Sequence, residues 1–212
     1  MMSQNQPSLI ALDLEGVLVP EIWIAVAEKT GIEGLKLTTR DVSDYDDLMQ
    51  GRLKILDENN LTLTHIQEVI ATLEPLSGAK DFLDQLRDSY PVIILSDTFY
   101  EFASPLMAQL NQPTLFCNSL EVDREQRIVD YHLRQKDGKR QAVRAFRGLN
   151  FRTLAAGDSY NDTTMLEEAD YGILFRASEN VATEFPQYKR AEDYATFRKH
   201  IDDSLAQLLH EK

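Results

Sequence analysis

The chain alternates short apolar runs with longer segments in which apolar residues recur every three or four positions. The runs at 9–12, 91–95, 151–156 and 171–175 have the length and apolar content of strands buried on both faces of a parallel sheet. Segment 78–89, which precedes the second run, carries an amphipathic helix pattern. Such a helix is typical of the right-handed crossover between parallel strands. The pattern therefore predicts an α/β fold with an open parallel sheet.

Three further helix patterns separate the first predicted strand from the crossover helix. Segments 20–30, 45–58 and 62–73 each place apolar residues on one face, and a proline at position 75 ends the last of them. The segment of residues 20–75 is too small and too tightly joined to its flanks to form an independent unit. We therefore expect a small helical lid, residues 20–75, inserted into a core domain made of residues 1–19 and 76–212.

The rest of the chain adds smaller elements to this core. Residues 114–117 form a short apolar strand, and residues 119–134 alternate polar and apolar positions around a turn at 124–126. That alternation predicts a β-hairpin on the edge of the core. A short helix capped by Ser178 and an amphipathic terminal helix over 194–209 complete the expected elements.

Acidic residues stand directly after two of the predicted strands. Asp13 and Glu15 follow the first strand, where Gly16 allows the chain to turn, and Asp158 and Asp162 follow the third. The carboxyl ends of parallel strands meet at one edge of a sheet, which is where ligands bind. Clustered carboxylates suit a hard divalent cation such as Mg²⁺, and an aspartate beside such a cation can attack phosphorus. A solvated acidic turn explains the first pair taken alone, and a helix N-cap explains one of the later acids.

Three polar residues elsewhere could hold an anion. Ser96 follows the second strand, although a helix cap is an alternative for this position. Lys139 opens a predicted helix, an unfavourable end for a cation, with a solvated lysine as the alternative and Lys136 as a competitor. Arg52 interrupts the apolar stripe of segment 45–58. It either meets an anionic partner or packs its stem while its guanidinium reaches water.

Composition narrows the class of protein. The 212 residues carry a net charge of −13 and include one cysteine, Cys117. A general nucleic-acid or anionic-membrane surface is not expected, because such surfaces need basic patches. No intrachain disulfide is possible, no apolar run approaches membrane-spanning length, and residues 1–8 lack the basic and apolar regions of a secretory signal. We therefore expect a cytoplasmic protein that binds neither nucleic acid nor membranes.

Four motifs in order carry a resemblance to a known family. They are DLEGV from Asp13, SDT from Ser96, the helix-opening Lys139, and GDSYND from Gly157. With them the chain resembles the haloacid dehalogenase superfamily of phosphotransferases with an aspartate nucleophile, across nearly its full length. Longer segments such as DLEGVLVPEIW, RLKILDE and AAGDSYNDTTML resemble the phosphoserine phosphatases of this superfamily that also transfer phosphate to homoserine. The resemblance implies a Rossmann-like core with a small cap, Mg²⁺ as cofactor, phosphoserine and homoserine as substrates, and a homodimer.

The resemblance also implies roles for the candidate residues. Asp13 becomes the nucleophile, and Glu15 the general acid and then the general base. Mg²⁺ ligands are Asp13, the backbone carbonyl of Glu15, and Asp158. The implied substrate-binding residues are Glu21, Arg52, Ser96, Asp97, Lys139 and Asn161, with Asp162 in a supporting position. Among them, Arg52 meets the substrate carboxylate and Glu21 its ammonium group.

The chain departs from the superfamily pattern at two places. Glu15 stands where most members have aspartate, and Asp97 and Thr98 stand where ordinary phosphoserine phosphatases have small residues. The longer side chain of Glu15 is expected to shift which acceptor is activated, which fits a phosphotransferase. Asp97 and Thr98 predict a different acceptor pocket. Three alternatives remain open at this point: a phosphatase for another small phosphorylated metabolite, a non-catalytic phosphate sensor, and a purely structural acidic domain.

Overall fold

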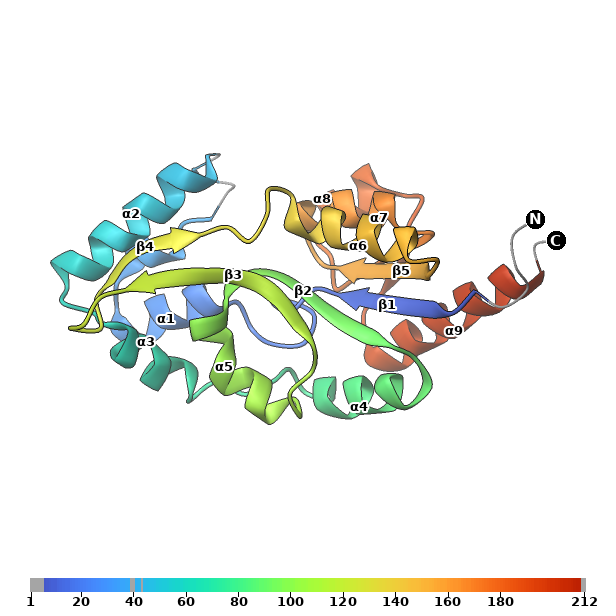
Figure 1. Ribbon diagram of the computed structural model, residues 1–212, viewed down its shortest axis with the longest axis horizontal. Helices are drawn as coiled ribbons and strands as arrows, with labels where there is room; N and C mark the ends of the chain where they lie inside the picture. Colours follow the sequence, from blue (N-terminus) through green and yellow to red (C-terminus); the bar gives the residue numbers. More distant parts are fainter. Residues whose placement is uncertain (1–5, 39–40, 43, 211–212) are drawn as a thin grey trace.

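A seven-stranded sheet forms the centre of the molecule (Figure 1). The computed structural model describes residues 6–38, 41–42 and 44–210, so part of the polar amino-terminal segment lies outside the described residues. The strands are β1 (Ser8–Leu12), β2 (Val92–Phe99), β3 (Leu115–Val122), β4 (Ile128–His132), β5 (Arg152–Gly157), β6 (Tyr171–Phe175) and β7 (Lys189–Ala191). Their order is β4-β3-β2-β1-β5-β6-β7, and every neighbouring pair except β3 and β4 is parallel. The predicted α/β fold is confirmed.

Helices cover both faces of this sheet. Residues of α4 (Ala79–Ser89), α5 (Tyr100–Gln109) and α9 (Tyr194–His210) pack in one apolar cluster, and residues of α6 (Gly138–Gly148), α7 (Thr163–Glu168) and α8 (Glu179–Glu184) pack in the other. Strand β1 divides its side chains between the two clusters, with Ile10 and Leu12 in the first and Leu9 and Ala11 in the second. Burial on both faces explains why this strand is a continuous apolar run.

The segment between β1 and α4 is helical, as predicted. It contains α1 (Ile22–Thr30), the 3₁₀ helix η1 (Glu33–Lys36), α2 (Tyr45–Glu58) and α3 (Leu63–Ile70). Gly31 ends α1 in the left-handed conformation, and the Asp44 carboxylate begins α2 by accepting hydrogen bonds from the first-turn backbone. These helices lie at the end of the elongated molecule opposite the termini (Figure 1).

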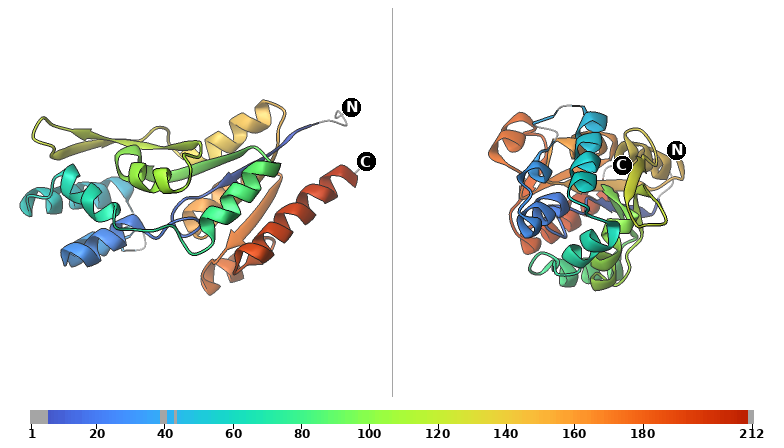
Figure 2. Two further views of the ribbon diagram at one scale, coloured as in Figure 1. Left: turned by 90° about the horizontal axis from the view of Figure 1, so that it is seen from below. Right: turned by 90° about the vertical axis from the view of Figure 1, so that its left-hand side faces the viewer.

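The β3–β4 hairpin differs from the predicted one. Strand β3 is continuous, so the short strand expected at 114–117 and the first hairpin strand are a single strand. The hairpin also leaves the core and lies along the inserted helices (Figure 2). The Leu63 N–H donates to the Gln126 carbonyl at 2.8 Å, and the Tyr131 hydroxyl donates to Asp46 Oδ1 at 2.6 Å. Alternation along one segment cannot show that its partner is a helix far away in the sequence.

Two further differences from the prediction concern strands β2 and β7. Strand β2 continues through the Ser96–Asp97–Thr98 motif to Phe99, instead of ending at Leu95. Phe99 precedes α5 and makes no side-chain capping bond, so Ser96 is not the cap of this helix. Strand β7, of three residues, is too short to show a pattern and was not expected. No helix in the described ranges has the length and apolar character needed to span a membrane.

A group of ion pairs fixes α6 against α7. The Glu168 carboxylate, whose side chain is 12% exposed, accepts from Arg144 Nη2 at 2.8 Å and Arg140 Nε at 3.0 Å. Arg147 donates to the Glu168 backbone carbonyl at 2.9 Å. The bonds from Arg144 and Arg140 lower the pKa of Glu168 to about 2. This contact therefore fixes two helices beside candidate site residues, since α6 carries Lys139 near its start and α7 follows Asp162.

We predict that Glu168→Gln lowers the free energy of unfolding by about 1–2 kcal/mol at pH 7, because charge-assisted hydrogen bonds are lost. The folded pKa is depressed, so this stabilisation is present above the ordinary value of 4.5 and is lost as the pH falls toward about 2. Urea denaturation at pH 7 and near pH 3.5 measures the change. The exposed neighbour Glu167 supplies a control, and Glu167→Gln should shift stability by less than about 0.5 kcal/mol. An equal effect of the two substitutions would contradict the prediction.

Candidate active site

Asp13 lies at the carboxyl end of β1, in the centre of the sheet. Its backbone N–H donates to the Ala156 carbonyl of β5 at 2.9 Å, so pairing continues one residue past the strand. The side chain is nearly buried, with 4% of the residue exposed, and its Oδ1 accepts from the Leu14 N–H at 2.8 Å. Burial, together with the neighbouring Asp162, raises the pKa of Asp13 well above its usual range.

Gly16 allows the loop after β1 to approach the loop after β5. Its φ of 74° is in the left-handed region, and a Cβ at this position would lie 2.5 Å from Asp158 Oδ2. A residue with a side chain would therefore push Asp158 away. The glycine brings the acids of two strand ends together, as the sequence predicted for Asp13 and Asp158.

Asp13, Asp158 and Asp162 form a cluster that could hold a metal ion. Their ligand atoms lie within 4.8 Å of one another. Burial and the neighbouring Asp162 raise the pKa of Asp158 to about 7. Carboxylate oxygens in this arrangement fit a hard divalent cation.

The members of this cluster are not equivalent. Asp162 is fully buried, and its Oδ2 accepts from the backbone N–H groups of Asp158 and Ser159 at 3.0 and 3.1 Å. Its Oδ1 accepts from Lys139 at 2.7 Å. Both oxygens of Asp162 are therefore engaged, which suits a supporting residue better than a ligand.

Lys139 joins the ends of three strands. Only 5% of the residue is exposed, and its Nζ lies 2.7 Å from Asp162 Oδ1, 2.9 Å from Asp13 Oδ1 and 3.5 Å from Asp97 Oδ2. Burial opposes the charge, but Asp13 and Asp162 outweigh it and hold the pKa of Lys139 above its usual range. Its competitor in the sequence, Lys136, is exposed.

The end of β2 contributes Ser96 and Asp97. Ser96 is buried, and its Oγ accepts from the Thr98 N–H at 3.2 Å. Asp97 is more open, with 46% of its side chain exposed, and its Oδ2 accepts from Asn161 Nδ2 at 3.0 Å. Ser96, Asp97, Lys139 and Asn161 therefore gather at the same sheet edge as the acidic cluster.

Asn118 also lies at this edge and is not among the site residues predicted from the sequence. Asn118 is a buried residue of β3, and its Nδ2 donates to the Asp97 carbonyl at 2.9 Å. Its Oδ1 accepts from the Arg134 N–H at 3.0 Å, which fixes the start of the segment leading to Lys139. An amide within an apolar strand is a signal that could have identified it, because buried polar groups need partners.

Arg52 and Glu21 belong to the inserted helical segment. Arg52 is buried, its Nη2 donates to the Leu37 carbonyl at 2.7 Å, and its guanidinium lies 4.6 Å from the centre of the Trp23 ring. The Nε of Arg52 is buried and has no hydrogen-bond partner among the described residues. The guanidinium therefore does not reach out to water, and Trp23, predicted only as part of an apolar face, is its platform.

Glu15 lies between this segment and the core. Its Oε2 accepts from the Ile22 N–H at the start of α1, at 2.9 Å. Burial, followed by the charge of Glu21, raises the pKa of Glu15 to about 8. Burial lowers the pKa of Arg52, and the charges of Tyr45, Glu15 and Glu21 oppose this effect. The side chains of Arg52, Glu15 and Glu21 therefore lie in one electrostatic neighbourhood.

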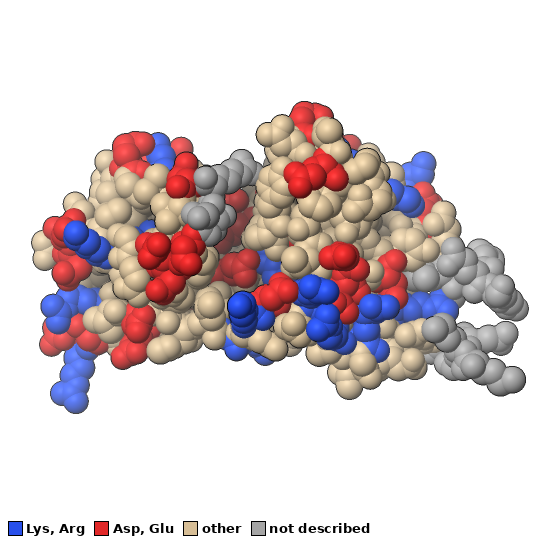
Figure 3. All heavy atoms as spheres, turned by 90° about the horizontal axis from the view of Figure 1, so that it is seen from above, with Lys and Arg blue, Asp and Glu red and all other residues tan. Residues whose placement is uncertain are grey.

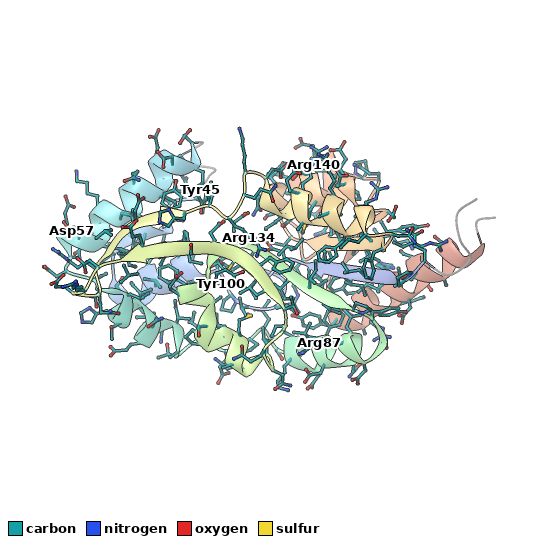
Figure 4. All side chains as sticks on the ribbon, viewed as in Figure 1. Tyr45, Asp57, Arg87, Tyr100, Arg134 and Arg140 are labelled. Atoms are coloured by element: carbon teal, nitrogen blue, oxygen red, sulfur yellow. The ribbon has the colours of Figure 1, made fainter. Side chains whose placement is uncertain are left out.

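Tyr45 gives a second link from the inserted segment to the core. It lies on the side of α2 that faces β4, with its ring 5.9 Å from that of Tyr131 (Figure 4). Its hydroxyl is 3.5 Å from the Asp97 carbonyl.

Acidic side chains line the hollow between the two ends of the molecule (Figure 3). A negative hollow of this kind needs a metal and buried cations before it can accept an anionic ligand.

The arrangement contains the parts required for phosphoryl transfer. A buried carboxylate, an adjacent acidic cluster, a buried lysine and a hydroxyl converge at one sheet edge, and Glu15 is available for proton transfer. Such chemistry depends on positioning and on charge neutralisation.

Comparison with known proteins agrees with this chemistry. Residues 7–170 match the family of haloacid dehalogenase-like hydrolases. The chain is 63% identical over 193 residues to the phosphoserine phosphatase ThrH of Pseudomonas aeruginosa, covering 91% of this chain and 94% of that protein. It is 61% identical to a phosphoserine phosphatase of Pseudomonas syringae pv. tomato, covering 91% of this chain and 81% of the relative.

Solved structures share the fold at much lower identity. A phospho-aspartyl intermediate analogue of a phosphoserine phosphatase superposes with a TM-score of 0.74 at 20% identity, covering 92% of this chain and 99% of that one. A substrate-bound phosphoserine phosphatase superposes with a TM-score of 0.70 at 19% identity, covering 90% and 95%. The family match and the two relatives lead to one conclusion: the chain belongs to the haloacid dehalogenase-like hydrolases.

Proposed function

We propose that this protein is a cytoplasmic, Mg²⁺-dependent phosphoserine phosphatase that can also transfer the phosphoryl group to homoserine. The observation that carries the proposal is the buried Arg52 guanidinium, with an unpartnered Nε, in the electrostatic neighbourhood of Glu15. A phosphatase for simple esters has no need of such a cation. A substrate with its own carboxylate supplies the missing partner.

Asp13 is the nucleophile in this proposal. Its carboxylate oxygen attacks phosphorus, the bond from phosphorus to the serine oxygen breaks, and Glu15 gives its proton to that oxygen. Glu15 then takes a proton from water or from the homoserine hydroxyl. The oxygen of that acceptor attacks the aspartyl-phosphate and releases the Asp13 carboxylate. Hydrolysis and transfer therefore share one covalent intermediate and differ only in the acceptor.

Asp13, the backbone carbonyl of Glu15, and Asp158 are the residues proposed to hold Mg²⁺. The geometry supports this, because the ligand oxygens of Asp13 and Asp158 lie within 4.8 Å of one another. Burial raises the pKa of both carboxyl groups, and a bound cation would favour their charged forms. A bound Mg²⁺ supplies charge neutralisation for the phosphoryl group. Asp162 holds Lys139 and the loop backbone instead of the metal.

The remaining residues bind different groups of the substrate. Ser96, Lys139, Asn161 and the backbone after Ser96 bind the phosphoryl oxygens. Arg52 binds the carboxylate and Glu21, which is exposed, binds the ammonium group. Opposite charges at fixed positions select an amino acid over a neutral phosphate ester.

Residues 20–75 form the cap domain in this proposal, and residues 1–19 with 76–212 form the core domain. The cap carries Glu21 and Arg52, while the core carries the groups for phosphoryl transfer. The contact from Tyr45 to the Asp97 carbonyl supports a cap that is seated over the site. Such a cap excludes water during the reaction and thereby favours an alcohol acceptor.

Incubation with phosphoserine and Mg²⁺, with and without homoserine, tests the proposed function. We expect free phosphate alone in the first case. With homoserine present, phosphohomoserine should appear at the expense of phosphate, because both products come from one phospho-enzyme. Phosphorus-31 NMR follows both products in the same sample. Phosphate without phosphohomoserine would exclude the transfer activity. The absence of both products would contradict the proposed function as a whole.

Substitution of Arg52 tests the assignment of the substrate carboxylate. Arg52→Ala should raise KM for phosphoserine about 100-fold, because a charge-assisted bidentate contact is lost, and should change KM for 4-nitrophenyl phosphate less than about threefold. Lys54→Ala is the matched control: Lys54 lies on the same helix and pairs at 3.8 Å with the exposed Glu58. Steady-state kinetics with both substrates measures the difference. An equal loss with both substrates would assign Arg52 to the structure of the cap instead of to substrate recognition.

A further inference from the structure

The Asp97 carboxylate contacts two of the groups that the proposed function assigns to the phosphoryl oxygens. Its Oδ2 lies 3.5 Å from Lys139 Nζ and accepts from Asn161 Nδ2 at 3.0 Å. Both partners are hydrogen-bond donors without acceptor capacity at these atoms. A carboxylate therefore already occupies a position suited to an anionic oxygen.

Asp97 adds a third carboxylate to the surroundings of the Lys139 ammonium group. An ammonium group has three N–H bonds, and three carboxylates surround this one, from Asp13, Asp97 and Asp162. Asp13 and Asp162 are nearly buried and hold the two shorter contacts, at 2.9 and 2.7 Å. Asp97 has the longest contact, so it is the partner that a ligand displaces most readily.

The Asp97 side chain can leave without moving its backbone. The Asp97 carbonyl is held by Asn118 Nδ2 at 2.9 Å and approached by the Tyr45 hydroxyl at 3.5 Å. Its side chain, however, is 46% exposed. A change of rotamer takes the carboxylate from Lys139 into solvent, where it is rehydrated.

We infer that Asp97 is a specificity-determining residue that competes with phosphoryl anions for Lys139 and Asn161. In the free protein its carboxylate occupies these donors, and a phosphoryl group binds only by displacing it. The inference rests on the proposed function, which assigns Lys139 and Asn161 to the phosphoryl oxygens. Its consequence is weak retention of inorganic phosphate, since the returning carboxylate replaces the product on both donors.

The competition affects ligands unequally. Phosphoserine has a carboxylate and an ammonium group that bind elsewhere, at Arg52 and Glu21 in the proposed site, and these contacts compensate for the displacement of Asp97. Inorganic phosphate has no such contacts, so the displacement of Asp97 lowers its affinity without compensation. Asp97 therefore favours the amino-acid substrate over the product and over simple phosphate anions.

Direct binding of inorganic phosphate tests the inference. Isothermal titration calorimetry in the presence of Mg²⁺ should show that Asp97→Asn binds phosphate about tenfold more tightly than the parent protein, because the isosteric amide lacks the charge that holds Lys139. Product inhibition of phosphoserine turnover by phosphate should strengthen by a similar factor. A side chain with only a structural role would loosen the site and weaken phosphate binding, so the direction of the change is diagnostic.

Asp137→Asn is the matched control. Asp137 is also near Lys139 in the sequence, but its carboxylate accepts from Thr164 Oγ1 at 2.9 Å, and its left-handed φ of 53° suits asparagine. Like Asp97→Asn, this substitution removes one negative charge, but it leaves the contact between Asp97 and Lys139 in place. The phosphate affinity of Asp137→Asn should therefore match that of the parent. Equal gains in both variants would reveal a general charge effect and overturn the inference.

Failure of the inference can be distinguished from failure of the proposed function. Phosphate binding by the parent with an unchanged or weaker affinity in Asp97→Asn overturns the role of Asp97 and leaves the phosphatase site intact. Absence of phosphate binding in the parent and in both variants contradicts both, since no phosphoryl site is then present.

Discussion

The Lys139 ammonium group is bonded to Asp13 and Asp162 at 2.9 and 2.7 Å in a site with little exposure to solvent. Burial of these charges is tolerated only while they remain paired. The pairing determines the geometry around it, because Asp13 follows β1, Asp162 follows β5, and Lys139 begins α6. It also leaves an excess of negative charge, which a divalent cation would neutralise. Loss of the lysine would therefore disturb Asp13 and the acidic cluster together.

The core and the inserted segment perform different tasks around this pairing. The core edge is polar and rigid, since backbone N–H groups and Asn118 hold its side chains. The inserted segment contributes Arg52, supported by Trp23, and reaches the core through Tyr45. In the proposed function the core carries out the transfer of the phosphoryl group and the insert selects the molecule that brings it. The β3–β4 hairpin contacts both parts, since Asn118 of β3 donates to the Asp97 carbonyl and Tyr131 of β4 donates to Asp46 of α2.

Much of this architecture was predictable because it depends on local pattern. The apolar runs before Asp13 and Asp158 must be buried strands, and parallel strands bring such acids to one edge. The role of Trp23 could not be predicted, because it comes from a partner on a distant segment. For Asn118 the amide itself was a signal, but the sequence does not show its partners, which also lie on distant segments. The contacts of Asp97 with Lys139 and Asn161 likewise depend on side-chain geometry that spacing does not determine. The hairpin was misplaced for the same reason: its outer end packs on α2 and α3, and alternation says nothing about the partner.

In the proposed function the phosphoryl group passes through Asp13. Rapid acid quenching of the protein during turnover of ³²P-labelled phosphoserine, followed by peptide mapping, locates the covalent phosphate. We predict label on the peptide that contains Asp13, and none on that peptide in Asp13→Asn, which should retain its fold because the side chains have the same shape. Label on another residue, or full turnover by Asp13→Asn, would contradict the assignment of Asp13 as the nucleophile.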